Sequence, residues 1–142
     1  MEDEFLLQML EKAIKDAANS LLLTKRLKPF AQALKYDNSI INFSSDEVDH
    51  NEGYENLWQR LHKEVKAGEI KAVILLQDGL LPEQFHMSQT KSIRIHIESK
   101  DNLDQKLGAR FLYVPYEKDL EKEGMKLFNP KPIAFAHEIF KI

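Results

Sequence analysis

The chain has 142 residues and a net charge of −3; 43% of its side chains are apolar, 30% are charged and none is a cysteine. The length fits one domain, 1–142, which buries about 70% of its extended surface on folding, and the mild negative charge argues against nucleic-acid binding through bulk positive charge. Without cysteine, disulfides, thiolate nucleophiles, iron–sulfur clusters and Cys-based zinc sites are excluded.

The first residues, Met1 to Phe5, are acidic where a secretory signal would be basic. No apolar run approaches the roughly 20 residues that a membrane span requires. A cysteine-free composition also suits a reducing compartment. We therefore expect a cytoplasmic protein with no membrane partner and no nucleic-acid partner.

An N-terminal helix is predicted over residues 3–25, because apolar side chains recur there at steps of three and four. Its apolar stripe consists of Leu6, Met9, Leu10, Ala13, Ile14, Ala17 and Leu21. Acidic residues at the start suit the positive end of the helix dipole. Pro29 forbids continuation, so an α+β body is expected over 29–142.

The body opens with a predicted hairpin. Two short extended segments, 30–35 and 39–43, flank Tyr36-Asp37-Asn38. Asp and Asn accept turn dihedrals and bond their own backbone, which favours a tight turn here.

A second helix is predicted from Gly53 to Ala67, after a polar connection over 44–52. Asn51 can cap its start, and Gly68 stands where a left-handed C-terminal residue is wanted. Its buried stripe consists of Tyr54, Leu57, Trp58, Leu61 and Val65.

Residues 70–76 form a nearly continuous apolar run, which indicates a central strand covered on both faces. After a loop over 77–90, residues 91–99 alternate strictly between apolar and polar. A strand repeats every two residues, so the isoleucines point one way and the polar residues the other. The isoleucines are Ile93, Ile95 and Ile97, and the polar residues are Arg94, His96 and Glu98. We expect the isoleucines to be buried and the polar residues to face solvent.

The C-terminal third is less regular. Residues 110–116 read as a strand with Pro115 near its end, where the lost donor costs least. Residues 117–125 are charged and expected to be exposed. The apolar tail, 133–142, is predicted to form a last helix, with an edge strand as the alternative.

The predicted order is therefore α-β-β-α-β-β-β-(α). Short connections favour antiparallel neighbours, so the class is α+β, with a mostly antiparallel sheet of about five strands and two or three helices. This order resembles the roadblock and profilin-like sandwiches, but topology alone does not carry function.

No catalytic residue, metal ligand set or cofactor site is predicted. His96 and Glu98 form a His-x-Glu pair like that of zinc deaminases, but those enzymes also need a Pro-Cys-x-x-Cys segment. Nucleophile elbows and glycine-rich phosphate loops are absent as well. Two interpretations of the polar strand face stay open: a solvated face with ordinary cross-strand pairs, or a small-molecule or metal-binding surface formed by Arg94, His96 and Glu98.

Five acids and no base occur between residues 46 and 55. They are Asp46, Glu47, Asp49, Glu52 and Glu55. Such a cluster serves the dipole of the following helix or forms a docking patch for a basic protein partner.

Four short segments together resemble a loosely defined group of small, uncharacterised bacterial proteins. They are Pro29-Phe30-Ala31, the run from Gly68 to Ala72, the run from Ile93 to Glu98, and Val114-Pro115-Tyr116. The resemblance spans most of residues 29–135. It implies a bacterial α+β domain of unknown function, among the neighbours of secreted-toxin systems, and transfers no site residue.

Three hypotheses follow. The first is a non-enzymatic interaction protein, immunity-like, that binds a partner through the acidic residues. The second is a symmetric homodimer whose sheets or second helices pair. The third is a domain that binds a small molecule or metal on the polar strand face.

Overall fold

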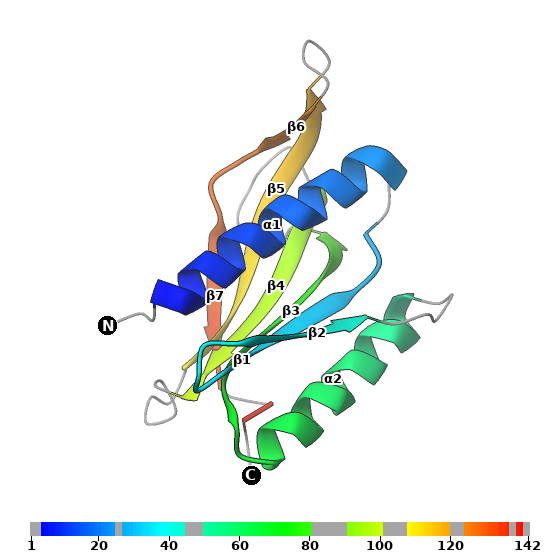
Figure 1. The fold of residues 1–142 in the computed structure, drawn as a ribbon. Coiled ribbons are helices and arrows are strands. Elements are labelled where there is room, and N and C mark those ends of the chain that lie inside the picture. Colours follow the sequence, from blue (N-terminus) through cyan, green and yellow to red (C-terminus); the bar gives the residue numbers. More distant parts are fainter. Residues whose placement is uncertain are drawn as a thin grey trace.

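The computed structural model describes residues 4–24, 27–44, 50–80, 91–100, 108–119, 124–136 and 139–140. In these ranges the elements are α1 (Glu4–Thr24), β1 (Phe30–Lys35), β2 (Ile40–Ser44), α2 (His50–Lys66), β3 (Ile70–Leu80), β4 (Lys91–Ser99), β5 (Ala109–Asp119), β6 (Gly124–Leu127) and β7 (Lys131–Phe135). The α+β class, the first helix, the hairpin and the alternating strand are confirmed (Figure 1).

Every strand pair is antiparallel, and the strand order is β2-β1-β3-β4-β5-β6, with β7 also paired to β5. The predicted central strand is central, since β3 pairs with β1 on one side and β4 on the other. In the described residues the sheet has seven strands rather than about five, because β6 was not predicted and the β7 region was predicted as a strand only as the alternative to a helix.

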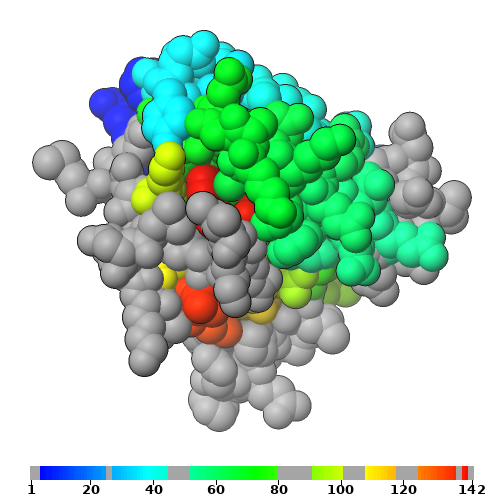
Figure 2. Space-filling view, turned by 90° about the horizontal axis from the view of Figure 1, so that it is seen from below, coloured from blue at the N-terminus to red at the C-terminus, as the bar shows by residue number. Residues whose placement is uncertain are grey.

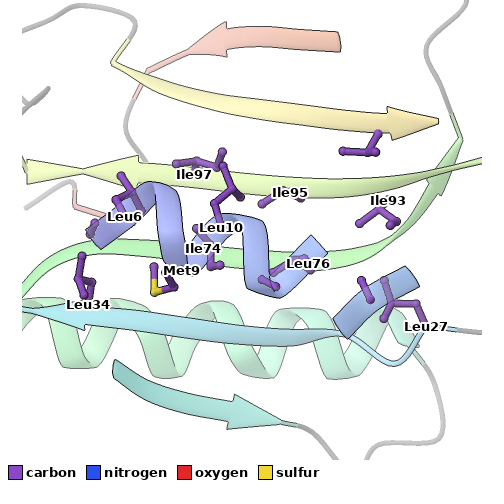
Figure 3. Close-up of a cluster of buried hydrophobic side chains, with 14 of the residues drawn as sticks. Leu6, Met9, Leu10, Leu27, Leu34, Ile74, Leu76, Ile93, Ile95 and Ile97 are labelled. Carbon is purple, nitrogen blue, oxygen red and sulfur yellow. The ribbon is translucent and has the colours of Figure 1, made fainter. Parts of the chain in front are cut away.

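The two helices cover opposite faces of the sheet, as Figure 3 shows with α1 in front and α2 behind. The α1 side is an apolar cluster that includes Leu6, Met9, Leu10, Ile74, Leu76, Ile93, Ile95 and Ile97. The α2 side includes Ala31, Ala33, Leu57, Leu61, Val73, Leu75, Ile139 and Phe140. Successive residues of β3 enter different clusters, as strand alternation requires. The fold is therefore a sheet between two helical layers.

The β1–β2 turn depends on Asn38, whose φ of 69° lies in the left-handed region that Asn tolerates. The Lys35 N–H donates to the Ser39 carbonyl at 2.9 Å and closes the hairpin. Asp37 accepts hydrogen bonds from the Ser39 hydroxyl and N–H, which hold the pKa of Asp37 below its ordinary value.

The end of α2 follows the prediction, but its start does not. Gly68 has φ of 92°, and its N–H donates to the Val65 carbonyl at 3.0 Å, which terminates the helix as left-handed glycines do. The helix begins at His50, so Asn51 lies inside the first turn and is not the N-cap. Glu52 in that turn suits the helix dipole, and the glycine at position 53 did not mark the boundary.

The charged segment predicted as exposed over 117–125 is partly strand. β5 continues to Asp119, and its last residues pair with β6. Pro115 therefore lies inside β5 and not near its end. It pairs with Ser92 at the limit of the β4 ladder, and its carbonyl accepts the Phe128 N–H at 2.8 Å. The proline stands where β5 changes partner, so the lost donor costs little.

The last helix predicted over 133–142 is wrong for the described residues of that range, and the alternative edge strand is correct for residues 133–135, which belong to β7 (Lys131–Phe135). β7 pairs with Ala109–Tyr113, alongside the β6 pairing with Tyr116–Asp119. β6 and β7 thus form one interrupted edge strand. Pro132 disfavours a helix through this segment because proline lacks the N–H and crowds the preceding turn.

Candidate functional site

The polar side of β4 lies inside the protein, contrary to the predicted solvated face. His96 is 1% exposed and Glu98 is 0% exposed, while Arg94 is half-buried. The isoleucines on the other side are buried as expected. Both faces are covered because α2 and the C-terminal residues pack where solvent was expected.

Glu98 is the centre of this buried polar region. One of its oxygens, Oε2, is hydrogen-bonded to His96 Nε2. Its carboxylate also accepts the Ile139 N–H, at 3.0 Å to Oε1 and 2.9 Å to Oε2, and the Phe140 N–H at 3.2 Å. Burial raises the pKa of Glu98, but the hydrogen bonds from these three residues outweigh burial and set the pKa below its ordinary value.

The C-terminal residues are also held from the α2 side. His62 Nδ1 donates to the Ile139 carbonyl oxygen, with 2.8 Å between the two atoms. The His62 ring stacks on Trp58 with 5.3 Å between ring centroids. In Figure 2 the red C-terminal residues lie against the green surface of α2. Ile139 is therefore held by β4 through its N–H and by α2 through its carbonyl.

Aromatic rings surround the rest of the polar side of β4. The His96 ring meets Phe111 and Phe135 edge-on, with centroids 5.2 and 5.0 Å away. The Arg94 guanidinium lies 5.0 Å from the Tyr54 ring and 4.9 Å from the Phe111 ring, at distances where cation–π attraction operates. Within the described ranges, His96 Nδ1 and Arg94 Nε have no hydrogen-bond partner.

This arrangement fits a structural role better than a catalytic one. Both oxygens of Glu98 and the Nε2 atom of His96 are engaged by groups of the protein itself. Among the residues that the structure describes, no three His, Asp or Glu side chains converge as a metal site would need. A shallow surface hollow occurs instead on α1, lined by Gln8, Glu11, Lys12 and Lys15.

The acidic residues can be placed only in part. Glu52 and Glu55 lie in the first two turns of α2 and are exposed. Asp46, Glu47 and Asp49 lie outside the described residues. The structure thus places two acids on the solvent side of a helix, apart from the buried Glu98.

The sequence did not predict a second group of polar contacts, which centres on Asp78. Asp78 on β3 accepts the Leu27 N–H at 3.0 Å and the Tyr116 hydroxyl at 3.1 Å. Burial, with the Asp78 charge and hydrogen bond, raises the pKa of Tyr116. The residue joins the segment after α1 to β5. The only sequence signal was an acid that follows an apolar strand.

Comparisons with protein-family models, with curated proteins and with solved structures return no match. Neither helix in the described part of the chain is long and apolar enough to cross a membrane.

Proposed function

We propose that the chain is a non-enzymatic protein-binding domain, immunity-like, that docks a basic partner through the acidic residues of 46–55. The observation that supports it best is the exposure of Glu52 and Glu55 at the start of a packed helix. Acids fixed on a rigid element attract and orient a basic surface. The ionisable groups inside the described core are meanwhile engaged in holding the fold.

Clustered acids of this kind contribute chiefly to the rate of association and to specificity. Their effect falls with ionic strength, because the screening length is about 8 Å at physiological salt. The proposal therefore requires binding that weakens when salt is added. It also requires that binding survive mutation of acids elsewhere on the surface.

The test is affinity capture from cells that express the chain, identification of the captured protein, and titration of the purified pair. Glu52→Lys with Glu55→Lys is expected to weaken binding by about tenfold or more, and added salt is expected to weaken the wild-type complex. The matched control is Glu11→Lys with Asp16→Lys, which reverses two exposed acids on α1. Equal affinity for wild type and the α2 variant would refute the proposal.

Binding of a small molecule or metal at Arg94, His96 and Glu98 is the second candidate. It would require His96 or Glu98 to leave partners that it already has, so it ranks below protein binding. Metal analysis of the purified protein tests it.

We also propose a relationship to the roadblock and profilin-like sandwiches, on the order of the elements alone. Membership of the small bacterial group is proposed on the short motifs alone.

A further inference from the structure

The two edges of the sheet differ in how they are protected against pairing with another strand. The β6–β7 edge is interrupted between the two strands and carries Pro132 within β7. Prolines, breaks and charges are common means of blocking an edge. β2 has the sequence Ile-Ile-Asn-Phe-Ser, without a charge or a proline. Among the described strands it is the last on its side of the sheet.

The pairing of β2 with β1 shows which of its backbone groups point outward. Lys35 and Ser39 form a bonded pair at the turn. Alternation along an antiparallel ladder makes Ala33–Ile41 and Ala31–Phe43 the next bonded pairs. The backbone N–H and C=O groups of the intervening residues therefore face away from β1. These residues are Ile40, Asn42 and Ser44.

An independent contact agrees with this assignment. Arg60 on α2 donates from Nη1 to the Ser44 carbonyl at 2.8 Å, so that carbonyl does point away from β1. Ile40 is 43% exposed, and Asn42 and Ser44 are exposed as well. In the described part of the chain no third strand covers this edge.

We propose that β2 pairs with β2 of a second copy, antiparallel and about a two-fold axis at Asn42. In this register Asn42 faces Asn42 of the partner subunit, and Ile40 faces the partner's Ser44. All three outward residues then meet outward residues, so each pair can exchange ladder hydrogen bonds. Such a self-complementary edge is what an isologous dimer requires, and the absence of charge means that no like charges meet along it.

The charges on α2 favour a second copy over an unrelated strand. α2 packs against β3 and β1 on the far side of the sheet in Figure 3, and its Arg60 reaches the Ser44 carbonyl of β2. Its exposed charges are acidic in the first half and basic in the second, namely Glu52 and Glu55, then Arg60, Lys63 and Lys66. A two-fold axis at β2 sets the two helices on the same side of the joined sheet in opposite directions. The acidic half of each helix then faces the basic half of the other, which is attractive.

Sedimentation at increasing concentration is the first test. The wild type is expected to approach twice the 16.5 kDa of one chain. Ile40→Lys is expected to raise the dissociation constant of the dimer about tenfold or more, because lysine on an edge strand opposes its pairing with another strand. The matched control is Leu127→Lys, an apolar residue 39% exposed on the opposite edge, which should leave the dimer intact.

Disulfide cross-linking tests the register itself. Because the chain has no native cysteine, only the introduced cysteines can form the cross-link. Asn42→Cys places two thiols on directly opposite residues, with Cα atoms about 5.5 Å apart, within disulfide range. Ile40→Cys places them four residues apart along the strand, about 13 Å, which a disulfide cannot span. Mild oxidation should link only the first variant, and this result does not depend on whether Ile40→Lys folds.

Three outcomes would overturn the inference. They are a wild type that stays monomeric at several hundred micromolar, equal cross-linking of the two cysteine variants, and dissociation by Leu127→Lys but not by Ile40→Lys. The inference does not rest on the proposed function, which is measured by the affinity for a basic partner and would survive a monomeric result.

Discussion

The two faces of β4 are both buried, yet they are stabilised by different interactions. Ile93, Ile95 and Ile97 pack against α1 among apolar side chains. On the opposite face, Glu98 and His96 form a buried hydrogen-bonded pair, and the Glu98 carboxylate also accepts the Ile139 N–H. Apolar packing is non-directional and tolerates volume-conserving exchange. A buried charge is tolerated only while its partners stay in place.

This difference means that the α2 face depends on specific partners from three parts of the chain. Glu98 lies on β4 and His62 lies on α2. The Ile139 N–H donates to the Glu98 carboxylate, and the Ile139 carbonyl accepts from His62. Removing the Glu98 carboxylate takes the acceptor from the Ile139 N–H and the partner from His96 Nε2. Substitutions on the two faces should therefore have different costs and different pH dependence.

The largest effect is expected for Glu98→Ala. The substitution leaves His96 and the Ile139 and Phe140 N–H groups without their acceptor inside the protein. Breaking a buried pair by removing one partner costs about 3–5 kcal/mol, which is a large share of the stability of a domain. Urea unfolding followed by circular dichroism measures it.

Two further variants show whether the cost comes from the lost acceptor. Glu98→Gln keeps one side-chain oxygen and should cost less than Glu98→Ala. Glu55→Ala removes an exposed acid and should change the free energy of unfolding by less than about 0.5 kcal/mol. A cost for Glu98→Ala no greater than that of Glu55→Ala would show that the buried pair contributes nothing to stability.

A smaller effect is expected from pH. The folded state lowers the pKa of Glu98 below its ordinary value of 4.5. Its contribution to stability is therefore complete above the ordinary carboxyl range and is lost as pH falls through the folded pKa. The difference in unfolding free energy between wild type and Glu98→Gln should be largest near neutral pH and should shrink below pH 4.5. A difference that stayed constant down to pH 2 would contradict the assigned direction of the shift.

Local sequence patterns were sufficient to predict most of the helices and strands. The three- and four-residue steps of α1, the Asn38 turn and the alternation of β4 each depend on residues close in sequence. The failures occurred where pairing overrode composition. Residues 117–119 are charged, yet they extend β5 because they pair with β6. Pro132 lies in a strand because β7 pairs with β5 there.

The site could be predicted only by half. The alternation correctly placed His96 and Glu98 on one side of β4, but a two-residue repeat does not show whether that side is exposed to solvent or buried. That side is buried partly by Ile139, which lies 41 residues beyond Glu98 in the chain and donates its N–H to the Glu98 carboxylate. A backbone N–H has no sequence signature, so nothing in the local pattern predicted the partner that buries the carboxylate.

The smallest effect is expected on the α1 face. Ile95 is fully buried there, and Ile95→Val removes one methylene group without removing any hydrogen bond. The expected cost is about 0.5–1.5 kcal/mol, and it should not change between pH 7 and pH 3, because no titrating group is lost. Urea unfolding at both pH values measures it beside Glu98→Gln. If Ile95→Val cost as much as Glu98→Ala, or varied with pH as Glu98→Gln does, the proposed distinction between a non-directional and a directional face would fail.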